Sequence, residues 1–77
     1  MADSLSSLKP GERAKVIGYA SGAREYRDKL LSMGLTKNVE FSVTRVAPLG
    51  DPVEIHVRGF SLSLRKGEAD ALRVERI

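Results

Sequence analysis

The feature that most constrains the fold of this 77-residue chain is a repeated alternation, with a period of two, of apolar with other side chains. It occurs in short segments bounded by Gly or Pro, at residues 13–19, 39–44, 53–58 and 60–65, with a last segment at 72–77. Successive side chains of a strand point to opposite faces, so each segment is typical of a strand with one buried side. Five short strands are therefore predicted.

One helix is expected between the first and second strands. Ala23, Tyr26, Leu30 and Met33 recur at helical spacing. Gly34 follows them and suits the left-handed residue that commonly ends a helix. Leu31 lies off this apolar stripe and is expected to face solvent, because it follows Leu30 by about 100° of helical rotation.

The connections indicate how the strands curve. Val46 breaks the alternation, which predicts a bulge or bend near Arg45. Residues 48–52 form a dense Pro and Gly turn, and residues 68–71 suit a single helical turn. Short connections between Val- and Leu-rich strands favour a sheet that curls until its ends meet.

The predicted fold class is thus mainly β, a small α+β chain: an SH3-like, five-stranded antiparallel barrel with one helix inserted after the first strand. An open α+β sandwich, whose helix covers one sheet face, is the structural alternative. A single domain over residues 1–77 is expected, since a chain of this length folds around one core, with the first few residues flexible.

The residue content and charge of the chain exclude several classes of protein. The chain has no cysteine, which excludes disulfide scaffolds and thiol chemistry. No apolar run approaches the roughly 20 residues that span a bilayer, and residues 1–7 do not resemble a signal peptide, so a cytoplasmic protein is expected. Thirteen Lys and Arg against ten Asp and Glu give a net charge of +3, spread along the chain, which favours a mixed solvated surface.

The sequence offers few candidate residues for catalysis or metal binding. His56 is the single histidine, and its strand position predicts an exposed side chain rather than a general base. His56 and Glu54 share a strand face but supply only two ligands, fewer than a protein metal site normally needs. No catalytic residue, metal ligand or cofactor is therefore predicted.

A binding role has more support. Phe41 and Phe60 occupy apolar strand positions and are expected in the core, which leaves few aromatic side chains for stacking on nucleic acid or for binding proline-rich peptides. Leu31, Leu35 and Leu49 together suggest an apolar patch for a protein partner.

Two stretches carry a resemblance to a known family. Residues 26–35 read YRDKLLSMGL, and residues 43–74 contain the turn PLGDP followed by VEIHVRGFSLSLRKGEADALRV. With the opening turn near Pro10 and Gly11, they resemble the FeoA family over almost the whole chain. One departure is Lys37–Asn38, where the family often has Pro-Gly; Asn tolerates the left-handed conformation, so the turn is expected to persist.

The resemblance implies a small SH3-like accessory of bacterial ferrous iron transport. Its implied partner is the membrane transporter FeoB, through a cytoplasmic part that includes a GTPase domain. Alternatives are a nucleic-acid-binding barrel face and a free relative of the SH3-like C-terminal domain of DtxR-type repressors. The basic face would carry Arg45, Arg58 and Arg65. The candidate partner-binding residues are Leu31, Leu35, Pro48, Leu49, Asp51, Pro52, Arg45 and Arg58.

Overall fold

The computed structural model describes residues 3–22 and 24–77 of the chain. Within them, six strands, two α-helices and two short 3-10 helices follow one another. Their order is β1 (Asp3–Ser4), η1 (Leu5–Ser7), β2 (Arg13–Tyr19), α1 (Arg24–Ser32), β3 (Glu40–Val46), η2 (Pro48–Gly50), β4 (Val53–Val57), β5 (Phe60–Leu64), α2 (Lys66–Ala71) and β6 (Leu72–Arg76).

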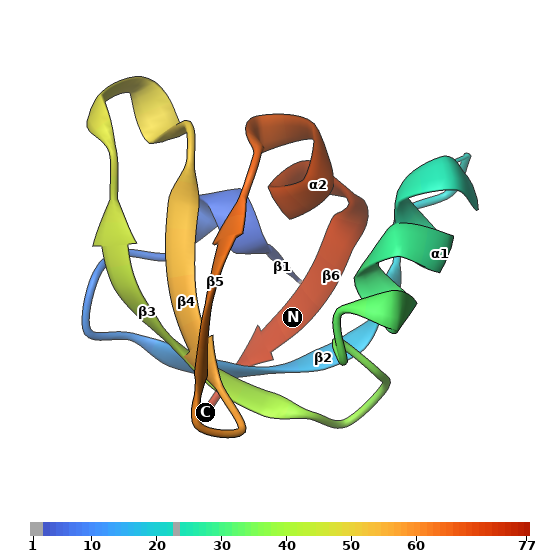
Figure 1. The fold of residues 1–77 in the computed structure, drawn as a ribbon, viewed down its shortest axis with the longest axis horizontal. Helices are drawn as coiled ribbons and strands as arrows, with labels where there is room; N and C mark the ends of the chain where they lie inside the picture. The colour runs from blue at the N-terminus through green and yellow to red at the C-terminus, as the bar shows by residue number, and fades with distance from the viewer. Residues whose placement is uncertain (1–2, 23) are drawn as a thin grey trace.

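The strands form one antiparallel sheet in the order β1-β6-β2-β3-β4-β5. The sheet is strongly curved, and α1 lies outside it beyond β2 (Figure 1). The predicted small, mainly β chain with five principal antiparallel strands is confirmed. The sheet does not close into a barrel in the described residues, because its two edge strands, β5 and β1, do not pair with each other. Helix α2, which directly follows β5, contacts both edge strands.

The core fills the concave side of this sheet. The alternation along β4 buries Val53, Ile55 and Val57 while His56 stays exposed, as the period of two predicts. The other fully buried large side chains come from nearly every element. They are Leu5, Leu30, Leu35, Leu64, Leu72, Val16, Val43 and Val74. A core that recruits the loops as well as the strands is expected in so short a chain, since little apolar surface is available.

The predicted bend near Arg45 is confirmed. The register between β3 and β4 shifts between Val43 and Arg45, so that Val46 comes opposite Val53 and its side chain is half-buried. A second shift, between Val16 and Gly18 of β2, has no signal in the alternation. Extra residues on one strand increase its local twist, and two such sites help the sheet to curl.

Helix α1 ends as its sequence predicts. Gly34 has φ 91°, the N–H of Leu35 donates to the carbonyl of Leu30 at 3.0 Å, and the N–H of Gly34 donates to that of Leu31 at 3.1 Å. This is the Schellman arrangement, in which an apolar contact between the residues corresponding to Leu30 and Leu35 is usual. Asn38 also keeps its turn, with φ 74°. Ala23 lies outside the described residues.

The N-terminal segment contributes to both the sheet and the core. Residues 1 and 2 lie outside the described part, but Asp3–Ser4 pairs with β6, and Leu5 and Leu8 are buried. Flexibility of the first few residues stays a prediction. Two leucines three residues apart can cover an end of the core, which a reading by strand alternation alone overlooks.

Two aromatic side chains are more exposed than predicted. Phe60 lies on the inner side of β5, opposite Val57, but it is 69% exposed because β5 begins there, beyond the core. Tyr26 is 41% exposed, so Leu30 is the one fully buried side chain of α1. Phe41 is buried as expected.

Candidate functional site

The connection between β3 and β4, residues 47–52, is anchored at its base. The N–H of Ala47 donates to the carbonyl of Pro52 at 3.1 Å. The Asp51 carboxylate accepts a hydrogen bond at 3.3 Å from the backbone N–H of Lys66, the first residue of α2, and lies 3.7 Å from the Arg65 guanidinium. Asp51 thus satisfies a free N–H at the start of α2, which holds the loop against this helix.

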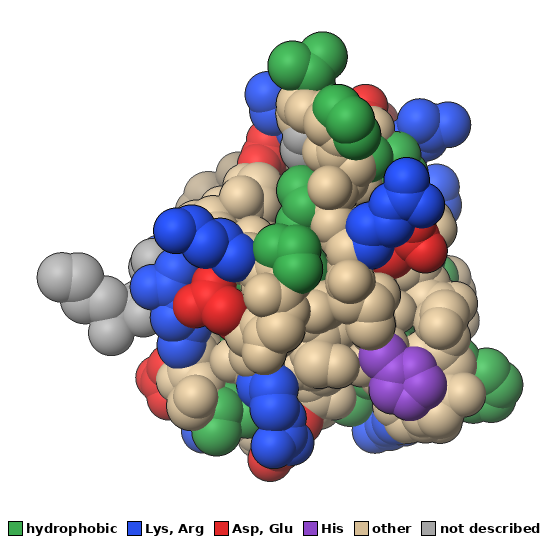
Figure 2. All heavy atoms as spheres, turned by 90° about the vertical axis from the view of Figure 1, so that its left-hand side faces the viewer, with side chains coloured by type: hydrophobic (Ala, Val, Ile, Leu, Met, Phe, Trp, Pro, Cys, Tyr) green, Lys and Arg blue, Asp and Glu red, His purple; other side chains and the backbone are tan. Residues whose placement is uncertain are grey.

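Leu49 stands at the tip of this anchored loop and is 97% exposed. Its φ of 69° lies in the left-handed region, which costs a residue with a Cβ atom roughly 1–2 kcal/mol. Hydrophobic side chains project at the top of the face shown in Figure 2, where Figure 1 places this loop. A leucine held in solvent in an unfavourable backbone conformation does not stabilise the fold, which makes it a strong candidate for a binding contact.

The other predicted partner-binding leucines behave differently from Leu49. Leu31 is 41% exposed, as its off-stripe position predicts. Leu35 is fully buried, so its predicted part in an exposed apolar patch is wrong. The reason is the helix cap, which turns the chain after Gly34 and directs Leu35 onto Leu30 inside the core.

Leu31 and the loop 47–52 do not form one surface. On α1, residues 29 and 31 lie about 100° to either side of Leu30, which faces the core. Lys29 forms an ion pair with Glu68 of α2, the helix against which the loop is anchored. Leu31 therefore lies on the side of α1 away from α2.

The predicted basic residues are mostly paired. Arg45 lies 3.8 Å from Glu54, and Arg65 lies 3.7 Å from Asp51. Arg58 is exposed in the two-residue turn between β4 and β5, without an ion pair among the described residues. Figure 2 shows Lys and Arg interspersed with Asp and Glu, so this face carries no continuous basic surface for nucleic acid.

The side chain of His56 is exposed on β4. Among residues 3–22 and 24–77, no three His, Cys, Asp or Glu side chains gather as a metal site would require. Glu54, the second candidate ligand, forms the ion pair with Arg45. In the same described part of the chain, no helix has both the length and the apolar character to cross a membrane.

Glu68 is a feature that the sequence did not indicate. It is the one buried charged residue among those described, 3% exposed. Its carboxylate accepts a hydrogen bond from Lys29 and another, at 2.8 Å, from the N–H of Arg65. The hydrogen bond from Lys29 lowers the pKa of Glu68; burial opposes this, and the hydrogen bond from Arg65 adds to it. Glu68 thereby joins α1 to α2 and completes the start of α2.

A surface hollow of about 340 Å³ lies where β2 leads into α1, lined by Tyr19, residues 20–22, Arg24 and Arg27. The Tyr19 hydroxyl donates to the carbonyl of Leu35 at 2.6 Å, and burial raises the pKa of Tyr19 against the opposing charge of Arg27. None of the predicted partner-binding residues lines this hollow. The hydroxyl contact fixes the loop after α1 to β2.

The chain matches a known family model and is similar to a known protein. Residues 4–76 match the model of the FeoA domain. A fusion of Fe(2+) transport protein A with the Fe(2+) transporter FeoB, from Porphyromonas gingivalis, is 36% identical over 73 residues, which are 95% of this chain and 8% of the fusion protein. The chain therefore spans only a small part of that relative.

Solved structures agree with this placement. An FeoA-like protein from Clostridium acetobutylicum superposes with a TM-score of 0.89 at 36% identity, over 99% of this chain and 87% of that one. A manganese-dependent transcriptional repressor superposes with a TM-score of 0.90 over 99% of this chain and 37% of the repressor. At 15% identity, the second likeness shows a shared fold alone.

Proposed function

Because the chain belongs to the FeoA family, we propose that it is a non-catalytic accessory protein of ferrous iron transport that binds the cytoplasmic, GTPase-containing part of a FeoB-type transporter. This role places it in the cytoplasm, at the inner face of the membrane when bound. The proposed architecture is an SH3-like barrel that stays open between β5 and β1, where α2 contacts both edge strands.

The observation that carries the proposal is the fusion protein, in which a homologous segment is part of one polypeptide with a FeoB transporter. A covalent link makes two modules meet at a high effective concentration, an advantage where they act together.

The proposed action is a shift between states of the partner. The described residues hold no group of three His, Cys, Asp or Glu side chains that could bind a metal ion. A protein of this kind alters transport by binding one conformation of the transporter more tightly than another, and the coupling equals that difference in affinity. Iron is cargo of the transporter and need not contact this chain.

Leu49 is the best-supported contact for this binding. Burying a leucine side chain in an interface stabilises the complex by about 1.5–3 kcal/mol, or roughly a 10- to 150-fold change in affinity. The loop around it is already fixed by Asp51 and Lys66, so binding costs little ordering of the backbone. Pro48 and Pro52 flank the tip and stiffen it further.

The test is calorimetric titration of the purified chain into the cytoplasmic part of a FeoB-type transporter. Leu49→Asn removes the apolar side chain, and Asn tolerates the left-handed conformation better than Leu does, so the variant remains folded. We expect its affinity to fall at least about tenfold. Ile77→Asn is the matched control, since Ile77 is also apolar and exposed (64%) but lies outside the proposed contact. Absence of binding by the unmodified chain would refute the proposed function.

Leu31→Asp tests the second candidate position in the same titration. It lies on the side of α1 away from α2, so it reports whether the partner also reaches α1. Unchanged affinity of a folded Leu31→Asp protein removes that face from the binding site.

Equal losses of affinity for Leu49→Asn and its control Ile77→Asn would show that Leu49 has no special role in binding.

A further inference from the structure

Strand β5 has a free edge, and the hairpin geometry shows which backbone groups lie on it. Val57 pairs with Phe60 across the two-residue turn Arg58–Gly59, whose φ angles of 50° and 81° are both positive. These are the features of a type I′ turn, in which the pair flanking the turn exchanges hydrogen bonds. The alternation of an antiparallel ladder then directs the N–H and C=O of every second residue of β5 toward β4.

The intervening residues, Ser61 and Ser63, therefore direct their backbone N–H and C=O groups away from β4. Strand β5 is the last in the sheet, and no hydrogen bond to these groups is found within the described part of the chain. Both serines are exposed. Two donors and two acceptors thus stand in a row, at the spacing that another strand would match.

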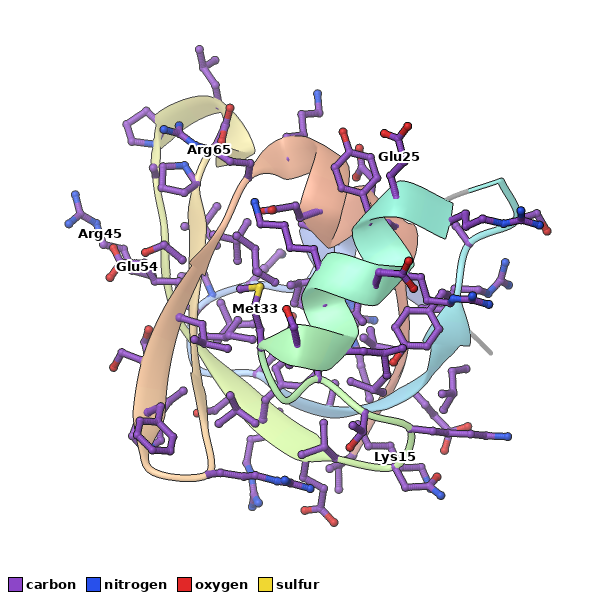
Figure 3. All side chains as sticks on the ribbon, turned by 45° about the vertical axis from the view of Figure 1, so that its right-hand side comes forward. Lys15, Glu25, Met33, Arg45, Glu54 and Arg65 are labelled. Carbon is purple, nitrogen blue, oxygen red and sulfur yellow. The ribbon has the colours of Figure 1, made fainter. Side chains whose placement is uncertain are left out.

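Apart from α2, which contacts β5 near its C-terminal end, this edge lacks the usual devices that prevent strand addition. Natural edge strands are blunted by Pro, by charged side chains or by bulges. Strand β5 reads Phe-Ser-Leu-Ser-Leu, and its register with β4 is uninterrupted. On its inner side, Phe60 is exposed and Leu62 is half-buried. Figure 3 shows Met33, also half-buried, just after the C-terminal end of α1.

The charges around β5 decide which kind of strand fits. Pairing with a second copy would be centred on Leu62, because the free groups of Ser61 and Ser63 are symmetric about it. Arg58 lies in the turn before β5, and Lys66 lies at the start of α2 after it. An antiparallel second copy would bring these cations toward each other at both ends of the pair, and like charges at close range destabilise strand pairing. A segment with acidic residues at its ends would meet the same cations favourably. Charge therefore favours a different, acidic partner over a second copy.

We propose that the free edge of β5 binds an extended segment of the partner as an added strand, through the backbone of Ser61 and Ser63. The segment has apolar side chains at alternate positions, which pack beside Leu62, and acidic residues at its ends, which meet Arg58 and Lys66. Main-chain hydrogen bonds supply affinity in such strand addition, and the alternate side chains supply specificity. The identity of the partner, though not the chemistry of the edge, rests on the proposed function.

The experiment uses the ¹⁵N-labelled full chain and two probes: the cytoplasmic part of a FeoB-type transporter, and a synthetic peptide with alternating valines between terminal aspartates. Each is expected to protect the amides of Ser61 and Ser63 from hydrogen exchange. Ser63→Pro removes an outward N–H without touching the β4 ladder and should weaken binding at least about tenfold. Ser63→Thr keeps the N–H and should bind normally.

A charge variant completes the design. Arg58→Asn creates the Asn-Gly pair that type I′ turns prefer, so the hairpin is retained while the charge is removed. Its affinity for the aspartate-ended peptide should fall about two- to fivefold, as expected for an exposed ion pair. A lysine-ended peptide of the same length should bind more weakly than the aspartate-ended one.

The outcomes separate the two proposals. Transporter binding that is unchanged by Ser63→Pro overturns the inference about β5 and leaves the proposed function intact. Failure of the transporter to bind refutes the proposed function, and the peptides then still decide the chemistry of the edge. If neither peptide protects Ser61 and Ser63, or if those amides become protected with rising chain concentration alone, the inference is wrong and, in the second case, a second copy is the occupant.

Discussion

Replacing Glu68 by glutamine should destabilise the fold, and the effect should depend on pH. Glu68→Gln keeps the size of the side chain but removes its charge. The Glu68 side chain is 5% exposed, whereas the Lys29 side chain is 61% exposed, so its ammonium regains water when its partner is lost. The cost is therefore less than the 3–5 kcal/mol of breaking a fully buried pair.

The magnitude follows from the two hydrogen bonds. A hydrogen bond to a charged group contributes about 1.5–3 kcal/mol, and a charge at a helix start about 0.3–1 kcal/mol. Discounting the Lys29 contact for solvent screening, and keeping the neutral hydrogen bond from the Arg65 N–H, leaves about 2 kcal/mol. For a chain of this size, that lowers Tm by about 8–16 °C.

The pH dependence gives the sharper test. The folded-state pKa of Glu68 is lowered from 4.5, so the stabilisation by its charge is present above that value and is lost as pH falls through the lower, folded-state pKa. Thermal unfolding of both proteins at pH 7 and near pH 3 should show a large difference that shrinks in acid. Glu25→Gln, an exposed change on α1, should shift stability by less than about 0.5 kcal/mol at either pH. A Glu68→Gln difference that is absent at pH 7, or undiminished near pH 3, would refute this reasoning.

Three further changes test other parts of the structure. Leu30→Ala should lower the free energy of unfolding by about 2–4 kcal/mol in chemical denaturation, because Leu30 is the one fully buried side chain of α1; a loss below about 1 kcal/mol would show that α1 does not depend on it. Gly67→Ala alone should be nearly neutral, because a Cβ there would lie 2.7 Å from the Tyr26 hydroxyl oxygen, and this clash offsets the gain in helix propensity. When Tyr26 is first replaced by Ala, the same change should raise the free energy of unfolding by up to about 1 kcal/mol. Strictly additive effects of the two substitutions would contradict the contact between these residues. The unmodified chain should not bind a single-stranded RNA at about 50 mM salt, because Arg45 and Arg65 are ion-paired, and tight, salt-sensitive binding in a fluorescence titration would contradict this.

The local elements were largely predictable because their causes are local. The alternation along β4 and β5 places every second side chain on one face, and this holds whatever the strand packs against. Gly34 and Asn38 adopt the left-handed conformation expected of them, and the break in parity at Val46 coincides with the bulge of β3. The exposure of Leu31 likewise followed from its angle on the helix.

What the sequence could not determine are the features that depend on how the ends of elements meet in space. Phe60 lies on the inner face of β5, as predicted, but past the end of the core. Leu35 is buried because the helix cap turns the chain inward. The sequence did not distinguish Leu49 from the other candidate leucines; in the structure it differs from them because Asp51 anchors its loop to α2. The anchoring of the 47–52 loop depends on a contact between residues far apart in the chain, and the burial of Leu35 depends on the direction that a local cap gives to the chain; periodicity encodes neither.

The same distinction applies to the binding surfaces. The sequence by itself determined a small, mainly β chain with no cysteine and a single histidine, because strand alternation and residue content are properties of the chain alone. Only the tertiary structure decided that the sheet stays open at β5 and that α1 and α2 are joined through Lys29 and Glu68. An open edge exists because no other strand reaches it, and that is settled by the arrangement of the whole sheet rather than by any segment of it.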